Sequence, residues 1–154
     1  MTPKEVRTKI RNGEIATQTS GMCNGYAQAN LCILPKKYAY DFLLFASRNP
    51  TSCPILEVLD EGCRYTKYMA DHADIATDIP KYRIYRNGEL TEEVTDISAY
   101  WQEDFVSFLI GCSFSSIICL IPRLRRNSPH LLWLIASLYH IINPLPSSLK
   151  IPST

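Results

Sequence analysis

The sequence predicts an α/β protein of mixed α+β type, and three observations carry this prediction. An apolar run, an amphipathic segment and a second apolar run follow one another between residues 29 and 59. An Asn-Gly pair stands between alternating runs at 82–95, and a capped helix opens the chain. Because 154 residues suffice for one hydrophobic core, we expect a single domain.

The amino end predicts a short helix. Thr2-Pro3-Lys4-Glu5 has the form of a capping box with proline at the first helical position. Val6 and Ile10 then fall on one helix face, and Asn12-Gly13 should end the helix because glycine tolerates the left-handed cap. This pattern favours a folded start over a cleaved transit peptide.

A loop comes next, and a strand, a helix and a second strand follow it. Residues 17–26 are rich in small and polar types, and their two glycines predict a loop whose backbone can approach another group closely. Residues 29–34 predict a buried strand that ends at Pro35, 36–49 an amphipathic helix, and 53–59 a second buried strand. This order favours part of a parallel or mixed sheet.

Three further segments complete the first 111 residues. Residues 60–80 lack a sustained period and predict a connecting segment with at most one helical turn. Asn87-Gly88 predicts a type I′ hairpin at about 82–95, because this turn needs two positive φ values. Asp96 can cap a further helix closed by Gly111, in which apolar residues recur at spacings of four and three: Ile97, Trp101, Phe105, Phe108 and Leu109.

The tail differs in composition from the rest of the chain. Residues 116–154 hold no Asp or Glu, although ordinary usage would place roughly four or five acids there, and they contain fifteen Leu or Ile and five Pro. The run 105–121 is almost long enough to span a membrane. Tail-mediated membrane association is the minor alternative, because Pro122, Arg123, Arg125 and Arg126 divide the two apolar stretches.

Charge and cysteine spacing exclude several classes of protein. The net charge of +1 provides no overall field that would favour nucleic acid or an anionic membrane. The six cysteines form no Cys-x-x-Cys pair and have no histidine at ligand spacing, so we expect no metal, and nothing indicates an organic cofactor. No secretory signal pattern is present, so we expect reduced, mostly buried thiols and a cytoplasmic protein.

Three blocks of the sequence carry a resemblance to a known family. They are GYAQANLCILPKKYAYDFLLFASRNPTSCPILEV at 25–58, IPKYRIYRNGELTEEVTDI at 79–97 and FLIGCSFS at 108–115. Together they resemble the putative hydro-lyase family related to D-glutamate cyclase. The resemblance covers about residues 1–115, and three long blocks in order are far more specific than one short motif.

The resemblance implies a fold and an activity. It implies a three-layer α/β portion with a smaller α+β insertion, here the hairpin of 79–97, in proteins typically over 200 residues long. Family members continue after GCSFS with Phe-Glu, where this chain has Ser116-Ile117. We therefore expect a partial domain over 1–115, truncated at its carboxyl end, and a tail over 116–154 outside the family fold. A reading-frame change, a mis-called exon or an alternative terminus would produce this junction.

The implied function is a carbon–oxygen lyase that acts on a small carboxylic acid. A similar domain occurs in a mitochondrial enzyme that converts D-glutamate to 5-oxo-D-proline and water, which makes a mitochondrial location the alternative. The competing interpretations are a catalytically inactive truncated member and a small-acid binding module. A missing sheet neighbour would leave an exposed strand edge, so a homo-oligomer is a further expectation.

Five residues are candidates for substrate binding, and one of them, Ser115, lies in the loop after Gly111. Arg48, beside Asn49 at a helix end, offers a planar fork for a carboxylate, and a surface ion pair or helix cap is the competing interpretation. Gln28 and Asn30 flank a strand entry, where their amides could contact a substrate or satisfy loop backbone.

The catalytic candidates are one carboxyl, one thiol and one hydroxyl. Glu57 is the acid most apt to be partly buried, which would raise its pKa toward a useful value, whereas on a solvent-facing edge it would be inert. Cys112 and Ser113 follow Gly111, in a loop where Ser115 and backbone N–H groups could bind an anion. A buried structural cysteine is the alternative for Cys112.

Overall fold

The computed structural model describes residues 1–154 apart from 20–21, 24–25, 27, 112–131 and 142–154, and for 132–141 it describes the backbone alone. Its helices are α1 (Pro3–Arg11) and α2 (Lys36–Arg48), with a 3-10 turn, η1, at Ser98–Tyr100. The strands are β1 (Gln28–Pro35), β2 (Ile55–Val58), β3 (Tyr82–Arg86), β4 (Glu89–Val94), β5 (Phe105–Gly111) and β6 (Leu132–Ile141). The predicted mixed α+β class is therefore confirmed.

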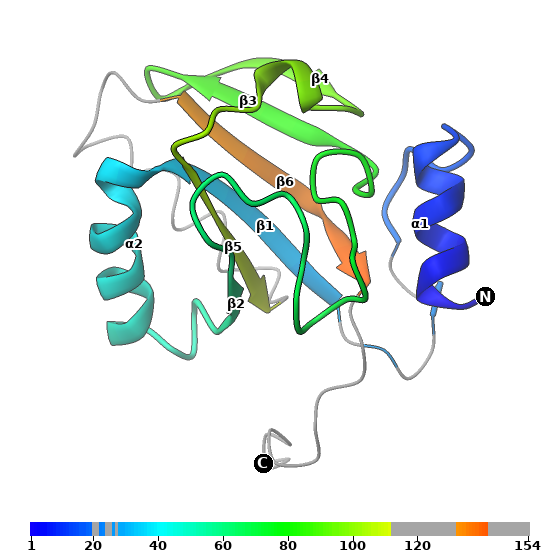
Figure 1. The fold of residues 1–154 in the computed structure, drawn as a ribbon, viewed down its shortest axis with the longest axis horizontal. Helices are drawn as coiled ribbons and strands as arrows, with labels where there is room; N and C mark the ends of the chain where they lie inside the picture. Colours follow the sequence, from blue (N-terminus) through cyan, green and yellow to red (C-terminus); the bar gives the residue numbers. More distant parts are fainter. Residues whose placement is uncertain (20–21, 24–25, 27, 112–131, 142–154) are drawn as a thin grey trace.

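The strands form a single sheet in the order β2-β5-β1-β6-β3-β4 (Figure 1). Every pairing between neighbouring strands is antiparallel. The two strands on either side of α2, β1 and β2, run in the same direction, but β5 lies between them and pairs with both. The predicted strand–helix–strand unit is present, but the expected parallel or mixed sheet is wrong, because β5 separates the two parallel strands and pairs antiparallel with both.

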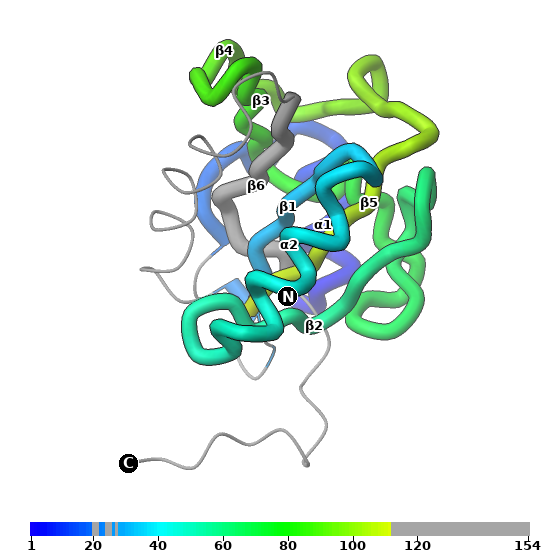
Figure 2. Tube along the Cα trace, turned by 90° about the vertical axis from the view of Figure 1, so that its left-hand side faces the viewer, coloured from blue at the N-terminus to red at the C-terminus, as the bar shows by residue number. Residues whose placement is uncertain are grey.

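Strands β1 and β5 of the sheet are buried on both faces. On β1, Cys32 and Leu34 pack with Phe42 and Ala46 of α2, while Leu31 and Ile33 belong to a second cluster on the opposite face. Figure 2 shows α2 in front of the sheet, in agreement with its packing on β1 and β5. The second cluster is covered by the segment 59–79, so the layers are a helix, a sheet and irregular chain.

The segment 59–79, most of which falls in the predicted connecting segment 60–80, is part of the core. Its buried residues include Leu59, Ala70, Ala73, Ile75, Ala76 and Ile79. It contains no helix, and its backbone is held by turns and by an isolated bridge between Tyr65 and Asp74. The small alanines of this segment allow its irregular chain to approach the sheet closely. This packing is not evident from the sequence, because polar and apolar residues alternate in the segment without a regular period.

Helix α1 forms as its sequence predicts. The Thr2 side chain accepts from the Glu5 N–H, and the Glu5 carboxylate accepts from the Thr2 N–H, which completes the capping box. Asn12 is the carboxyl-terminal cap, and Gly13 follows it with a left-handed φ of 77°. Val6 and Ile10 pack in a small cluster of their own with Cys23.

The hairpin is also confirmed. Asn87 and Gly88 have φ values of 53° and 79°, as a type I′ turn requires. The backbone of β6 pairs with β3 on one side and with β1 on the other, so the hairpin continues the main sheet.

The predicted helix after Asp96 is wrong. Asp96 accepts from the Ser98 N–H, but only the single 3-10 turn η1 follows. Phe105 and the residues after it form β5, which is nearly fully buried. A strand that is buried on both faces carries apolar residues without the alternation typical of a half-buried strand. The spacing of four and three between these apolar residues therefore matched the pattern of a helix by chance.

Candidate functional site

Two of the predicted site residues, Gln28 and Asn30, lie at one end of the sheet, which we call the β1 amino end. β1 begins here and β5 ends here, with Ala29 opposite Gly111. β2 also begins here, with Ile55 opposite Ile110. α2 runs back from Pro35 on the left of the view, and its last turn leads into β2, whereas β1 begins on the right (Figure 1). The topology thus places Gln28 and Asn30 at the β1 amino end, and Arg48 and Asn49 apart from them at the end of α2.

The two predicted amides point to the α2 face. Gln28 Nε2 donates to the backbone oxygen of Thr19 at 3.0 Å, so this side chain ties the loop before β1 to the sheet. Asn30 lies two residues farther along the same face and is 5% exposed. Gln28 therefore satisfies loop backbone, which was the competing interpretation, and Asn30 is the buried amide of the pair.

At the end of α2, Arg48 and Asn49 differ in environment. Arg48 is exposed. Asn49 Nδ2 donates to the carbonyl of Phe45 at 2.8 Å, and the Asn49 carbonyl accepts from the N–H groups of Ser52 and Cys53. Asn49 is thus the residue that closes α2 and turns the chain toward β2.

Glu57 is buried, as predicted, but it faces the irregular layer. Its Oε1 accepts from the Lys67 N–H at 2.7 Å and the Tyr68 N–H at 3.3 Å, and its Oε2 accepts from the Met69 N–H at 2.9 Å. These three bonds fix the turn at 67–69. None of the other predicted site residues that the structure describes contacts this carboxylate through a hydrogen bond.

Cys112, Ser113 and Ser115 lie outside the described residues, as does the backbone of their loop. They follow Gly111, whose N–H donates to the Pro54 carbonyl at 2.8 Å. The chain therefore enters the predicted anion-binding loop at the β1 amino end, and the roles of these three residues stay predictions.

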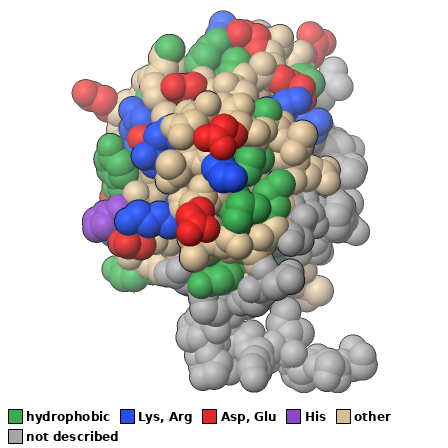
Figure 3. All heavy atoms as spheres, turned by 90° about the vertical axis from the view of Figure 1, so that its right-hand side faces the viewer, with side chains coloured by type: hydrophobic (Ala, Val, Ile, Leu, Met, Phe, Trp, Pro, Cys, Tyr) green, Lys and Arg blue, Asp and Glu red, His purple; other side chains and the backbone are tan. Residues whose placement is uncertain are grey.

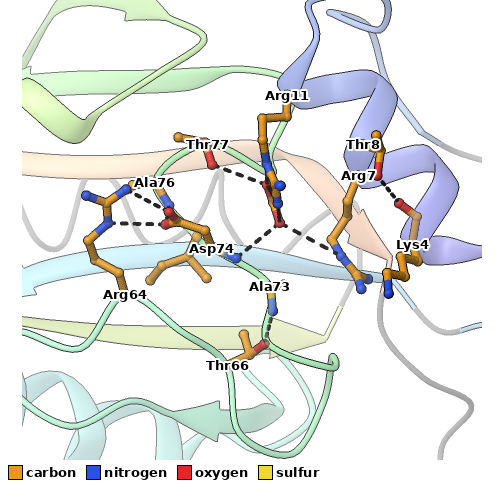
Figure 4. Close-up of polar contacts among 12 residues, drawn as sticks. Lys4, Arg7, Thr8, Arg11, Arg64, Thr66, Ala73, Asp74, Ala76 and Thr77 are labelled. Carbon is orange, nitrogen blue, oxygen red and sulfur yellow. Dashed lines mark hydrogen bonds and ion pairs between the residues drawn. The ribbon is translucent and has the colours of Figure 1, made fainter.

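A buried charge cluster that the sequence did not indicate lies where α1 meets the irregular segment (Figure 4). Its centre is Asp78, whose side chain is 1% exposed. Arg11 approaches Asp78 with Nε at 2.9 Å and Nη2 at 2.7 Å from Oδ1. Arg7 Nε lies 3.9 Å from Oδ2. We call Arg7, Arg11 and Asp78 the Asp78 cluster.

A second ion pair extends the cluster toward the 3-10 turn. The Asp74 N–H donates to Asp78 Oδ2 at 3.1 Å, and the Asp74 carboxylate pairs with Arg64 at 2.7 Å. Arg64 also lies over the Trp101 ring, 5.8 Å from its centroid. The charges thus link α1, the irregular segment and the residues before β5 in one network.

The surroundings of Arg7 shift the ionisation of this region. Burial lowers the pKa of the Arg7 guanidinium, and the opposing attraction of Asp78 and Asp71 does not cancel that effect. Burial likewise raises the pKa of the neighbouring Cys23 thiol. The hydrogen bond that Arg64 donates to the Asp74 carboxylate, by contrast, raises the pKa of Arg64. Arg7 is thus a cation whose burial its carboxylate neighbours offset only in part.

The sequence holds one weak signal for this cluster. Arg7 and Arg11 are four residues apart, so they share a helix face, and that face borders the stripe of Val6 and Ile10. Nothing local distinguishes Asp78 from the other acids of 60–80, because its partner stands 67 residues away.

Neither a metal-binding cluster nor a membrane-spanning helix occurs among the described residues. Among the described residues, no three His, Cys, Asp or Glu side chains come together as ligands. The four cysteines in this part of the chain are free thiols, and Cys23, Cys32 and Cys53 are buried. Within the same residues, neither helix has the length and apolarity to cross a bilayer. Acidic and basic side chains intermingle on the face shown in Figure 3.

The fold and the cluster together define a mixed α+β domain with buried charges beside the β1 amino end. The chain is similar to three relatives that are each named a putative hydro-lyase. The Clostridium beijerinckii protein is 65% identical over 115 residues, which are 75% of this chain and 44% of the relative. The Oceanobacillus iheyensis protein is 60% identical over 123 residues, or 80% and 48%. Bacillus subtilis YcsI is 59% identical over 115 residues, or 75% and 45%.

These identities show that about three quarters of the chain is homologous to proteins that carry the hydro-lyase name. The chain spans less than half the length of these relatives. No protein-family model matches the chain.

Proposed function

We propose that this chain is a member of the hydro-lyase family of its relatives and contributes to a carbon–oxygen lyase that acts on a small carboxylic acid. The observation that carries the proposal is the 56–65% identity to curated proteins named putative hydro-lyase, over at least 113 residues. Identity at that level over most of a folded sheet implies the same fold, and the names of these relatives suggest the reaction class. The homologous part does not by itself supply the whole relative's activity, because it spans less than half of each relative.

The specific reaction that we propose is the cyclisation of D-glutamate to 5-oxo-D-proline and water. The neutral α-amine attacks the δ-carboxyl carbon, so a carbon–nitrogen bond forms and a carbon–oxygen bond breaks. One carboxyl oxygen leaves with two protons as water. The reaction needs a base for the amine, an acid for the departing oxygen and donors for the developing oxyanion.

Two features of the β1 amino end support a small acid as substrate. The end gathers Asn30, as a buried amide, with the entry to the 112–115 loop. The Asp78 cluster places buried guanidinium charge beside the loop that precedes β1. The proposed catalytic roles of Cys112 and Ser113 rest on the sequence alone, and Glu57 is held by backbone donors in the other layer.

The direct test is turnover by the purified 154-residue chain. D-Glutamate, with L-glutamate as the stereochemical control, is incubated with the protein and 5-oxoproline is measured by mass spectrometry. Formation above the rate with heat-denatured protein supports the proposal. Full-length YcsI from Bacillus subtilis is assayed in parallel, because it includes the part of the relatives that this chain does not match.

The comparison separates the alternatives. Turnover by YcsI alone, with saturable binding of D-glutamate by this chain, favours a small-acid binding module. Turnover by neither protein counts against D-glutamate as the substrate.

A further inference from the structure

A strand from the tail joins the two parts of the sheet. β6 lies between β1 and β3 and pairs antiparallel with both (Figure 1). The blocks that carry the resemblance end at residue 115, whereas β6 begins at Leu132. The matches to the relatives cover 113 to 123 residues, fewer than the 141 from Met1 to the end of β6. The joining strand thus lies beyond the resemblance.

β1 and β3, by contrast, both lie within the blocks that resemble the family. β1 falls in the block 25–58 and β3 in the block 79–97. Each has one neighbour from the same part of the chain, β5 for β1 and β4 for β3. The opposite edge of each strand pairs with β6. Among the described strands before residue 112, none pairs with these two edges.

The two edges are aligned with each other. Leu134 of β6 lies opposite both Ile33 of β1 and Ile84 of β3. Because neighbouring strands lie about 5 Å apart, the edges enclose a space one strand wide, which we call the β1–β3 slot. Ile33 and Ile84 both belong to the cluster that the segment 59–79 covers. The two strands thus present the same face to this cluster at the same point of the slot.

The alignment continues on the other face of the sheet. Leu34 and Tyr85, each one residue farther along its strand, both belong to the cluster that α2 covers. Alternate residues of a strand in the slot must therefore face the two clusters in turn. This requirement fixes the orientation and the register of the strand, whatever its origin.

An empty slot would be unfavourable. The N–H and C=O groups along both edges would lose their partners, and the hairpin of β3 and β4 would lose its hydrogen-bonded connection to β1. Relatives that share this part of the chain at 56–65% identity therefore need a strand in the slot as well. More than half of each of these relatives lies beyond the match, and that part is long enough to supply the strand.

We propose that the β1–β3 slot is a strand-acceptor site, and that its partner is an extended strand from the part of the hydro-lyase relatives that this chain does not match. β6 fills the slot in this chain. Supplied in trans, the strand of the relatives competes with β6 for the same backbone groups and joins the sheet by β-augmentation. This interaction depends on homology and on backbone pairing, and not on the identity of the substrate.

Photo-cross-linking of two full-length proteins tests the origin of the strand. A diazirine amino acid replaces Leu31 or Arg83, one on each edge of the slot, in this chain and at the aligned positions of Bacillus subtilis YcsI. Side chains opposite each other on neighbouring strands lie about 5 Å apart, within reach of a diazirine. Glu92 of the outer strand β4 is the matched control, because β4 does not border the slot. Circular dichroism reports whether each labelled protein is folded.

In this chain, the labels at Leu31 and Arg83 should both cross-link to residues 132–141. In YcsI, both labels should cross-link to one short segment beyond the match, and the label at the Glu92 position should not reach that segment. Cross-links in YcsI that stay within the matched part, or that reach different segments from the two edges, overturn the inference. So does the absence of cross-links to 132–141 in this chain.

A mixture of this chain with an isotope-labelled copy distinguishes a second copy as the partner. Cross-links from Arg83 to 132–141 should join residues of the same copy. Cross-links between copies, without a cross-link beyond the match in YcsI, would assign the slot to β6 of a second copy and overturn the inference.

A titration tests whether the slot accepts a strand in trans. A synthetic peptide of the YcsI segment that the cross-links identify is added to the full chain, and its binding is measured by fluorescence anisotropy. Leu134→Pro should weaken the hold of β6, because Leu134 lies between Ile33 and Ile84 and proline removes an N–H from the middle of the sheet. Leu134→Val keeps that N–H and is the matched control.

We expect Leu134→Pro to bind the peptide about ten-fold or more tightly than the wild type, because β6 competes in the wild type at a high effective concentration. Leu134→Val should bind it as the wild type does, and a peptide of scrambled order should not bind. Equal binding of the YcsI peptide by the wild type and by folded Leu134→Pro overturns the inference.

The cross-links decide the question if Leu134→Pro does not fold, because they leave β6 unchanged. The 5-oxoproline assay is independent of both experiments. Turnover by YcsI without the expected cross-links removes the proposed partner of the slot and leaves the proposed function, whereas the expected cross-links without turnover do the reverse.

Discussion

Arg11 and Asp78, 67 residues apart, form a bidentate ion pair in which Arg11 Nη2 lies 2.7 Å from Oδ1 and 2.9 Å from Oδ2 of the carboxylate. Asp78 is almost completely buried, and Arg7, which lies on α1 with Arg11, faces it. The pair joins α1 to the segment 59–79, which covers one face of the sheet. This carboxylate therefore helps to hold α1 in place, together with the packing of Val6 and Ile10.

Asp78→Asn should destabilise the protein by about 3–5 kcal/mol, because it leaves the Arg7 guanidinium buried with less compensation. Urea unfolding followed by circular dichroism measures the loss. Asp41→Asn, on the exposed surface of α2, is the matched control and should change stability by less than about 0.5 kcal/mol. Equal losses in the two variants would show that the cluster does not stabilise the fold.

Glu57→Gln should lower the stability of the protein, because the Glu57 carboxylate anchors the turn at 67–69. The amide keeps the shape of the carboxylate but offers one acceptor oxygen, so part of the set of Lys67, Tyr68 and Met69 N–H groups loses its partner. We expect a loss of about 1–3 kcal/mol. Hydrogen exchange should show faster exchange of these three amides. Full stability combined with loss of turnover would instead assign Glu57 to catalysis.

The elements that the sequence predicted correctly have local causes. The capping box of α1 needs only Thr2 and Glu5, and the hairpin needs only Asn87-Gly88 between its strands. The prediction of a helix in place of β5 was wrong, because the burial of β5 on both faces depends on α2 and on the segment 59–79, which lie far away in the sequence. Its place between β1 and β2 is equally non-local.

The candidate site shows the same division. The ends of strands and helices could be read from the sequence. Polar candidates were therefore expected at the start of β1, with Gln28 and Asn30, and at the end of α2, with Arg48. Whether such a group binds backbone or a ligand depends on distant residues, as Glu57 and the 67–69 turn illustrate. Arg7 was missed because its burial arises from the docking of α1 near Asp78.

Tyr82→Phe should lower stability at neutral pH by about 1–3 kcal/mol, since the buried hydroxyl donates to the Ile75 carbonyl at 2.7 Å. Burial raises the pKa of Tyr82 well above its ordinary value of 10.0. The neutral phenol thus contributes stability that is complete below pH about 10 and is lost as pH rises toward the folded-state pKa, because only the unfolded chain then ionises.

The loss of stability at high pH can be measured by comparing the wild type with Tyr82→Phe. Above pH 10 the wild type should lose about 1.4 kcal/mol per pH unit more than Tyr82→Phe, as one proton requires. Urea unfolding between pH 8 and about 11 measures both curves. Parallel curves would mean that Tyr82 ionises equally in the folded and unfolded chains.

Two buried hydroxyls give a matched pair of substitutions. Ser107 Oγ is buried and has no hydrogen-bond partner among the described residues. Thr66 Oγ1 donates to the Ala70 carbonyl at 2.6 Å and accepts from the Ala73 N–H at 3.0 Å. Ser107→Ala should therefore be neutral or stabilise by about 1 kcal/mol, and Thr66→Val should cost about 1–3 kcal/mol. A loss above about 1 kcal/mol in Ser107→Ala would reveal a partner for this hydroxyl.

Gly62 and Gly13 share a left-handed backbone but differ in the space around them. Their φ values are 71° and 77°, so alanine should cost about 1–2 kcal/mol at either position. At Gly62 the added Cβ would lie 2.8 Å from the backbone oxygen of Glu103, whereas at Gly13 nothing lies within 4 Å. Because a backbone oxygen cannot rotate away, Gly62→Ala should cost about 1–3 kcal/mol more than Gly13→Ala.

The additional strain should appear in a particular contact. The Gly62 N–H donates to the Phe105 carbonyl at 2.8 Å, and the Gly62 carbonyl accepts from Trp101 Nε1 at 3.3 Å. Chemical unfolding measures the two stabilities, and the indole N–H resonance of Trp101 should shift in Gly62→Ala and remain unchanged in Gly13→Ala. Equal stability of the two variants would contradict the close approach of this turn to the start of β5, since the left-handed backbone cost is common to both.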